Sequence, residues 1–168
     1  TKLANAGGAP NVSSYNTSVS RPDTMTLNFQ TGVAEDTLVF GSIHSTDWGS
    51  AQIDSQTGTT ATSITSQFWD TKTYSFGVAR KLSDNLLLTG SLSKENGGKT
   101  TTSSTFTVNN GYTAFSLGAR YTVGKMTISG GYNYSRLGDF DVVVSNVNQA
   151  SYRNNSVNAL ALKIGFDF

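Results

Sequence analysis

The sequence predicts an all-β protein, an antiparallel up-and-down β-barrel whose strands cross a membrane. Three observations favour this fold: the alternation of residue types along the strands, a composition poor in charge, and a regular alternation of short and long connections. The last nine residues alternate most clearly, and their apolar face carries Leu160, Leu162, Ile164, Phe166 and Phe168. A period of two indicates a strand with two unlike faces. We interpret Phe166 and Phe168 as the assembly signal of an outer-membrane barrel, the alternative being the last strand of a soluble sandwich.

The composition supports the barrel. Charged residues make up 14% of the chain, against roughly 25% in an ordinary soluble domain. Serine and threonine together number 45 of the 168 residues, and small polar side chains suit the interior of a barrel. The net charge of +1 gives no electrostatic reason to expect nucleic acid as a partner. Without cysteine, a disulfide framework and a cysteine-based metal site are excluded.

A transmembrane helix is also excluded. It would need about 20 consecutive apolar residues, whereas the longest apolar run here is Ala159-Leu160-Ala161-Leu162. A secretion signal with a basic segment before an apolar one is not visible either. We therefore expect that a signal has been removed or that the chain is a piece of a longer protein.

Strands one to three are predicted at residues 24–33, 37–48 and 71–81. The first alternates large apolar residues with polar ones, at Met25, Leu27, Phe29 and Val33. The second has less distinct faces. In the third, the large side chains Tyr74, Phe76 and Val78 oppose Ser75, Gly77 and Ala79. Each stretch is close to the length of about ten residues that a tilted transmembrane strand requires.

Strands four to seven are predicted at residues 86–93, 112–123, 126–134 and 160–168. In the fourth strand, the apolar face carries Leu86, Leu88 and Leu92. In the fifth strand, it carries Phe115, Leu117, Ala119, Tyr121 and Val123. In the sixth strand, it carries Met126, Ile128, Tyr132 and Tyr134. All three faces oppose residues that are mostly Ser, Thr, Gly or Asn, so the same lipid-out pattern recurs along the chain.

The connections alternate between short and long without exception. The short ones are 34–36, 82–85 and 124–125, and the long ones are 49–70, 96–111 and 138–155. Outer-membrane barrels have tight periplasmic turns and longer extracellular loops. We therefore divide the chain into a polar extracellular segment, residues 1–23, and the barrel strands with their long extracellular loops, residues 24–168. The composition of the loops predicts solvated segments with little regular structure.

Seven antiparallel strands do not close as a bacterial barrel, because strand numbers there are even. An open edge would expose backbone N–H and C=O groups to lipid at a cost of several kcal/mol each. Residues 10–20 could supply an eighth strand, although they offer few apolar side chains. Alternatively, the first half of a larger barrel is missing from this chain.

A sequence pattern supports the second alternative, that the first half of a larger barrel is missing from this chain. It runs from Arg21-Pro22-Asp23 through Thr24–Gln30, then through Asp36–Ile43 to Thr46-Asp47-Trp48. This stretch resembles the FadL-type family of outer-membrane transport proteins. The resemblance implies a fourteen-stranded barrel of which seven strands form the carboxy-terminal half. It also implies diffusion of long-chain fatty acids or other hydrophobic compounds, and a companion chain or amino-terminal fragment that carries the family's plug and completes the wall.

Three charged residues are candidates for contact with a ligand in the barrel interior. Arg120 and Lys163 lie on the small-residue faces of their strands, and Glu95 immediately precedes the long connection at 96–111. A charge on the lipid face near the midplane costs roughly 2–4 kcal/mol, so an inward position is required. The cations either attract the carboxylate of a fatty acid or form ion pairs with Glu95, Asp167 or the missing half.

Other candidates concern the membrane surface. Trp48, Tyr121, Tyr132 and Tyr134 are predicted interfacial aromatic residues, and Arg136 is placed to meet headgroup phosphates. The expected partners are outer-membrane lipid, lipopolysaccharide and a hydrophobic small molecule.

No enzyme, cofactor or metal site is expected. With one histidine, His44, a Ser-His-Asp triad that includes Asp47 can be drawn, but the motif that would accompany it is missing. Asp139 and Asp141 are expected to be solvated, with calcium binding the alternative.

Two functions therefore remain open. One is passive transport of hydrophobic molecules by the larger barrel. The other is a small eight-stranded barrel whose interior is filled and whose loops bind a surface partner. The small inward side chains favour the larger barrel.

Overall fold

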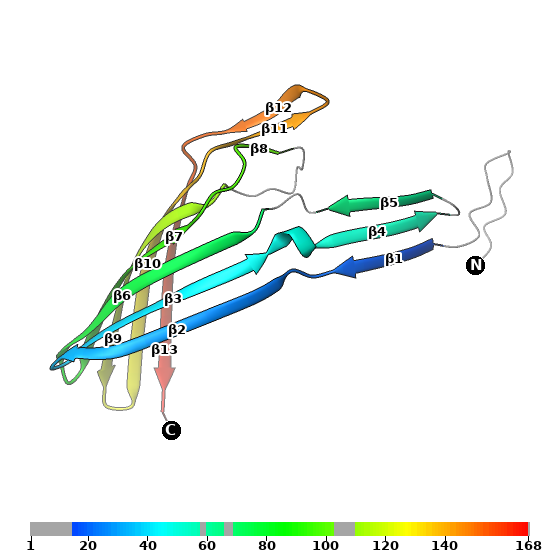
Figure 1. Cartoon of the computed structure of the whole chain (residues 1–168). Helices are drawn as coiled ribbons and strands as arrows, with labels where there is room; N and C mark the ends of the chain where they lie inside the picture. Colours follow the sequence, from blue (N-terminus) through cyan, green and yellow to red (C-terminus); the bar gives the residue numbers. More distant parts are fainter. Residues whose placement is uncertain (1–14, 58–59, 66–68, 103–109, 168) are drawn as a thin grey trace, which may run out of the picture.

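Seven strands form one curved antiparallel sheet in the computed structural model, which describes residues 15–57, 60–65, 69–102 and 110–167 (Figure 1). The sheet order is β13-β10-β9-β7-β6-β3-β2. Its strands are β2 (Asp23–Ala34), β3 (Thr37–Asp47), β6 (Thr71–Ser83), β7 (Leu86–Glu95), β9 (Tyr112–Val123), β10 (Met126–Leu137) and β13 (Ser156–Phe166). The predicted all-β, antiparallel, up-and-down arrangement of seven strands is confirmed.

Three two-residue turns join these strands at the end of the sheet where the carboxy terminus lies (Figure 1). They are Glu35–Asp36, Asp84–Asn85 and Gly124–Lys125. Gly124 has a φ of 56°, in the left-handed region that glycine enters without steric cost. The predicted segregation of short and long connections to opposite ends is therefore correct.

The long connections contain strands that the composition did not predict. The strands β4 (Gln52–Thr57) and β5 (Thr60–Thr65) form a hairpin, and β1 (Tyr15–Ser20) pairs with β4. These three strands continue beyond β2, β3 and β6 (Figure 1). The expected solvated loop at 49–70 and the polar segment at 1–23 thus include regular structure. Because β1 pairs with β4, it is not an eighth strand of the main sheet.

A second small sheet lies at the same end, beyond β10 and β13 (Figure 1). It contains β8 (Thr101–Thr102), β11 (Phe140–Val144) and β12 (Val147–Tyr152) in the order β12-β11-β8. Strand β8 pairs with β11 in parallel because β7 and β10 run in the same direction on either side of β9. The two connections at 96–111 and 138–155, which were expected to be loops with little regular structure, are therefore joined to each other by strand pairing.

The main sheet is open, and its edges are β2 and β13. Six successive antiparallel pairings separate these two strands, so β2 and β13 run in the same direction. They could meet directly only as a parallel pair. Closing this sheet with antiparallel neighbours therefore needs an odd number of further strands.

The register gives the sheet two unlike faces. We call the outer face the side that carries the large apolar residues, and the inner face the other side. One outer row runs across the sheet through Phe29, Gly41, Phe76, Leu92, Phe115, Tyr134 and Asn158. In β6 the outer residues Tyr74, Phe76 and Val78 are exposed, whereas the inner residues Gly77 and Ala79 are buried. Most large apolar side chains thus face away from the sheet's own interior, whereas Leu38, Phe40 and Leu87 are on the inner face.

Candidate ligand-facing wall

Small side chains dominate one part of the inner face. One cross-strand row there consists of Gly32, Leu38, Ala79, Thr89, Gly118, Gly131 and Ala161. The rows nearer the long connections carry hydroxyl and amide groups that bond to one another, such as Ser75 Oγ to Ser93 Oγ at 2.8 Å and Asn133 Nδ2 to Ser116 Oγ at 2.7 Å. These hydroxyl and amide groups are thus hydrogen-bonded within the wall, and the Phe40 ring packs over Gly77 on the same face.

A row of cations crosses the inner face near the short turns. Lys81 pairs with Leu87, Leu87 with Arg120, and Arg120 with Ser129, which pairs with Lys163. We call Lys81, Arg120 and Lys163 the basic row. Arg120 and Lys163 lie two strands apart, about 10 Å. Lys81, Leu87 and Arg120 also line a cavity of about 320 Å³, so charged and apolar groups meet there.

The register brings Arg120 and Lys163 together as the sequence suggested, and it adds Lys81. The alternation of β6 places Lys81 on the same face as Ser75, Gly77 and Ala79, a signal that was available in the sequence. Lys81 Nζ lies 2.9 Å from Asp84 Oδ1. This contact, chiefly its hydrogen bond, lowers the pKa of the Asp84 carboxyl in the turn.

An ion pair with Glu95, one of the alternatives for these cations, is not formed. Glu95 is opposite Tyr112, and Arg120 lies eight residues farther along the same strand, which is about 26 Å. Glu95 Oε2 instead accepts a hydrogen bond from Thr73 Oγ1 at 3.0 Å. Among the described residues, the salt bridges join Lys81 to Asp84 and Arg153 to Asp141, so Asp167 does not pair with Lys163 either.

His44 lies on the inner face at the long-connection end, in one row with Thr73 and Glu95. Its Nδ1 is 2.7 Å from the hydroxyl of Thr26, and its Nε2 is 3.1 Å from the hydroxyl of Thr46. Both ring nitrogens are therefore engaged by threonine. Asp47 accepts the backbone N–H of Ser50 instead, and the arrangement is not that of a catalytic triad.

The predicted interfacial aromatic residues lie at different heights. Tyr121 and Tyr134 are on the outer face, 44% and 39% exposed, toward opposite ends of the sheet. Tyr132 lies at mid-height and donates a hydrogen bond to Asn158 Oδ1 at 2.7 Å. Trp48 is half-buried in the short 3-10 helix η1 (Trp48–Ser50) at the long-connection end. Their interfacial role stays a prediction.

Of the two aromatic residues in the predicted assembly signal, Phe166 is on the outer face and 61% exposed. Phe168 lies outside the described residues. The assembly role of both is likewise a prediction that the fold leaves open.

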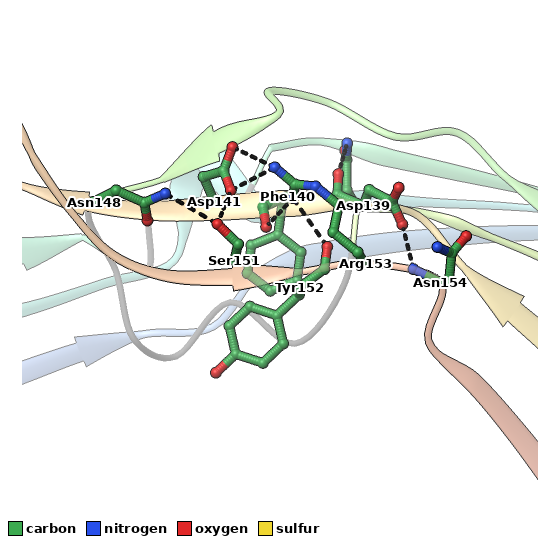
Figure 2. Close-up of polar contacts among 9 residues, drawn as sticks. Asp139, Phe140, Asp141, Asn148, Ser151, Tyr152, Arg153 and Asn154 are labelled. Carbon is green, nitrogen blue, oxygen red and sulfur yellow. Dashed lines mark hydrogen bonds and ion pairs between the residues drawn. The ribbon is translucent and has the colours of Figure 1, made fainter.

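The acidic loop residues are held by a clamp around Arg153 (Figure 2). The guanidinium donates to both carboxylate oxygens of Asp141, at 2.6 and 2.8 Å, and to the Phe140 carbonyl at 2.9 Å. Ser151 also donates to Asp141, and the Asn154 N–H donates to Asp139 Oδ1. The hydrogen bond from Arg153 is the main reason that the pKa of Asp141 is lowered.

This clamp engages the carboxylates that calcium would need. In the part of the chain that the structure describes, no three His, Cys, Asp or Glu side chains gather as a metal would require.

Across the described residues, none of the helical segments has the length and apolar character needed to span a membrane.

Neither a family model nor a curated protein sequence matches this chain. Among solved structures, it is similar to a Pseudomonas aeruginosa FadL homologue, with a TM-score of 0.62 and 14% sequence identity. The superposition covers 85% of this chain and 33% of the FadL homologue. The chain therefore has the fold of part of a FadL-like barrel and spans about a third of that protein's length.

Proposed function

We propose that this chain is part of the wall of an outer-membrane β-barrel through which hydrophobic compounds, long-chain fatty acids among them, pass by diffusion. The observation that carries the proposal is the division of the sheet into an apolar outer face and an inner face made mostly of small and hydroxyl-bearing residues, with one basic row. The fold shared with a FadL homologue supports it.

The height of the apolar outer face fits a membrane. On β6 it lies between the outer-facing cations Lys72 and Arg80, eight residues apart, or about 26 Å along the strand. A strand tilted by about 40° then covers roughly 20 Å, close to the apolar band of about 25 Å that outer-membrane barrels present to lipid. Long cationic side chains at both ends can extend into the headgroup regions.

The rest of the wall must come from other strands. An open sheet edge in lipid leaves backbone groups unsatisfied at several kcal/mol each. A second copy in the same orientation would place its β2 beside β13, and these strands run in the same direction. We therefore infer completion by a different segment with an odd number of strands. Seven more would give the fourteen strands that the family resemblance implies.

The basic row places positive charge at the short-turn end of the interior. A carboxylate that reaches the short-turn end meets Arg120 and Lys163, which have Ser129 between them, while Leu87 lies on the other side of Arg120, next to Lys81. Arginine binds carboxylates through paired, charge-assisted hydrogen bonds. The neighbouring inner row of mostly small residues, which includes Ala79, Gly118 and Gly131, leaves room for an apolar chain. This arrangement favours amphiphiles with an anionic head.

The test is uptake by proteoliposomes that contain the complete barrel. We expect uptake of a long-chain carboxylate above that of protein-free liposomes. The paired substitution Arg120→Gln and Lys163→Gln should reduce this uptake about tenfold, the effect of losing one charge-assisted hydrogen bond. Uptake of the uncharged alcohol with the same chain should not change.

The matched control is Lys125→Gln, which removes a cation from the turn between β9 and β10 outside the inner face. It should leave the uptake of both compounds unchanged. Uptake no faster than in protein-free liposomes would contradict transport, and equal loss for the alcohol would contradict the role of the basic row.

A further inference from the structure

Three polar residues on the outer face meet at the long-connection end of the sheet. Lys94 of β7 pairs with Thr113 of β9, which pairs with Arg136 of β10. Lys94 and Arg136 are thus two strands apart, about 10 Å. All three line one cavity of about 270 Å³, whose boundary also includes Gly97 and Gly138 of the long connections. We call Lys94, Thr113 and Arg136 the rim site.

Neither cation of the rim site forms a salt bridge among the described residues. The Arg136 guanidinium donates to the neutral amide oxygen of Asn154 at 3.3 Å. Glu95 borders the same cavity, but its carboxylate binds Thr73 on the inner face. Lys72, diagonal to Lys94 across β6 and β7, adds a third outer-facing cation. Two cations and a hydroxyl at this spacing suit a phosphate group.

An apolar groove lies on the same face nearer the middle of the sheet. Its volume is about 510 Å³, and most of its lining consists of outer residues, among them Leu117, Ala119, Gly130, Tyr132 and Leu160. Four residues of the inner row of small residues complete the lining: Thr89, Gly118, Gly131 and Ala161. The small residues Ala119 and Gly130 are a cross-strand pair and form the floor between larger neighbours. From Thr113 to Leu117 is four residues along β9, or about 13 Å. An acyl chain that descends from a phosphate at the rim site would therefore reach the groove.

We propose that the outer face binds one phosphate-bearing, acylated lipid of the surrounding membrane, with its phosphate in the rim site and an acyl chain in the groove at Gly130. Unpaired positive charge at the rim complements the headgroup, and hydrocarbon fills an apolar depression that would otherwise lose dispersion contacts. This inference rests on the membrane location in the proposed function, but not on transport through the interior.

The test is binding of lipid A, with and without its phosphates, to the complete barrel in lipid nanodiscs, measured by native mass spectrometry. Wild type should prefer the phosphorylated form. The paired substitution Lys94→Gln and Arg136→Gln should weaken its binding at least about tenfold and leave the dephosphorylated form unaffected. The control Lys125→Gln should bind both forms as wild type does. Unchanged binding by the paired variant, or an equal loss in the control, would overturn the rim site.

A separate variant tests the apolar groove. Gly130→Leu fills it, and because the nearest atom to an added Cβ is 3.9 Å away, the strand can accept the side chain. We expect weaker binding of lipid A but unchanged binding of inorganic phosphate. Unchanged lipid A binding would overturn the acyl site. Liposome uptake separates the two proposals: absent uptake with intact lipid binding would refute transport alone, and normal uptake with no preference for phosphate would refute this inference alone.

Discussion

At the scale of single residues, the inner face depends on side chains that are small enough for their neighbours. Gly77 is buried beneath the Phe40 ring. A Cβ added at Gly77 would overlap the end of that ring and would lie 2.8 Å from the Cβ of Ser91. Both strands would have to shift, because the Ser91 Cβ is fixed to its backbone. The absence of a side chain at this position is therefore a packing requirement.

We predict that Gly77→Val lowers the free energy of unfolding by about 1–3 kcal/mol, the usual cost of overpacking. The measurement is denaturant unfolding of the complete barrel in lipid vesicles. Gly165→Val is the matched control, since nothing lies within 4 Å of a Cβ at Gly165. Equal stability of the two variants would show that Phe40 does not hold its ring over Gly77.

At the scale of elements, the hairpin β11–β12 is stabilised by charge and by stacking. The rings of Phe140 and Tyr152 stack with centroids 4.7 Å apart, and Arg153 holds Asp141 across the two strands. Asn110 connects this region to the preceding long connection, because its side chain accepts the Gly98 N–H and donates to the Asp139 carbonyl. The hairpin is thus anchored on both sides.

We predict that the hairpin loses stability in acid. The pKa of Asp141 is lowered in the folded state, so its stabilisation is full above the ordinary carboxyl pKa of 3.8 and is lost as the pH falls through the lower folded value. Hydrogen exchange of the β11–β12 amides, each rate divided by that of the unfolded chain, should show less protection at the acid end. Arg153→Gln should have low protection already at neutral pH and little further change, whereas a wild-type-like response would contradict the clamp.

The main strands and short turns could be predicted because each carries a local signal. Large apolar residues alternate with small ones in β6 and β9, and Gly124 marks a turn. Strand β13 begins at Ser156 rather than Leu160, because its outer residues Ser156 and Asn158 are polar and hid the alternation. The strands in the long connections were missed for a similar reason, since β4 and β5 are rich in Ser and Thr and form by pairing with each other.

The candidate site was predicted less completely than the fold. Alternation gives the face of a residue, and that was enough to group Arg120 with Lys163. Height along the sheet depends on register, which the sequence does not encode locally. For that reason Glu95 was one possible partner of Arg120 but lies about 26 Å away. The rim site emerged only once the rows were known.

At the scale of the whole molecule, the two faces and the two edges of the sheet both require a larger assembly around it. The outer face exposes large apolar side chains, with Leu162 72% and Phe76 53% exposed, which water would disfavour and lipid would cover. The parallel directions of β2 and β13 require an odd number of additional strands. Both features are met if this sheet is about half the wall of a larger barrel that spans a membrane.

The most direct test of this account is labelling of single cysteines in lipid vesicles, which is possible because the chain has no cysteine of its own. The neighbouring residues Leu162 and Lys163 occupy the outer and inner faces of β13. In the complete barrel, Lys163→Cys should react with a water-soluble maleimide, and Leu162→Cys should be protected from it. The same contrast is expected for Ala161→Cys and Leu160→Cys. Equal labelling on both faces, or faster labelling at Leu162, would contradict a wall with lipid on one side and water on the other.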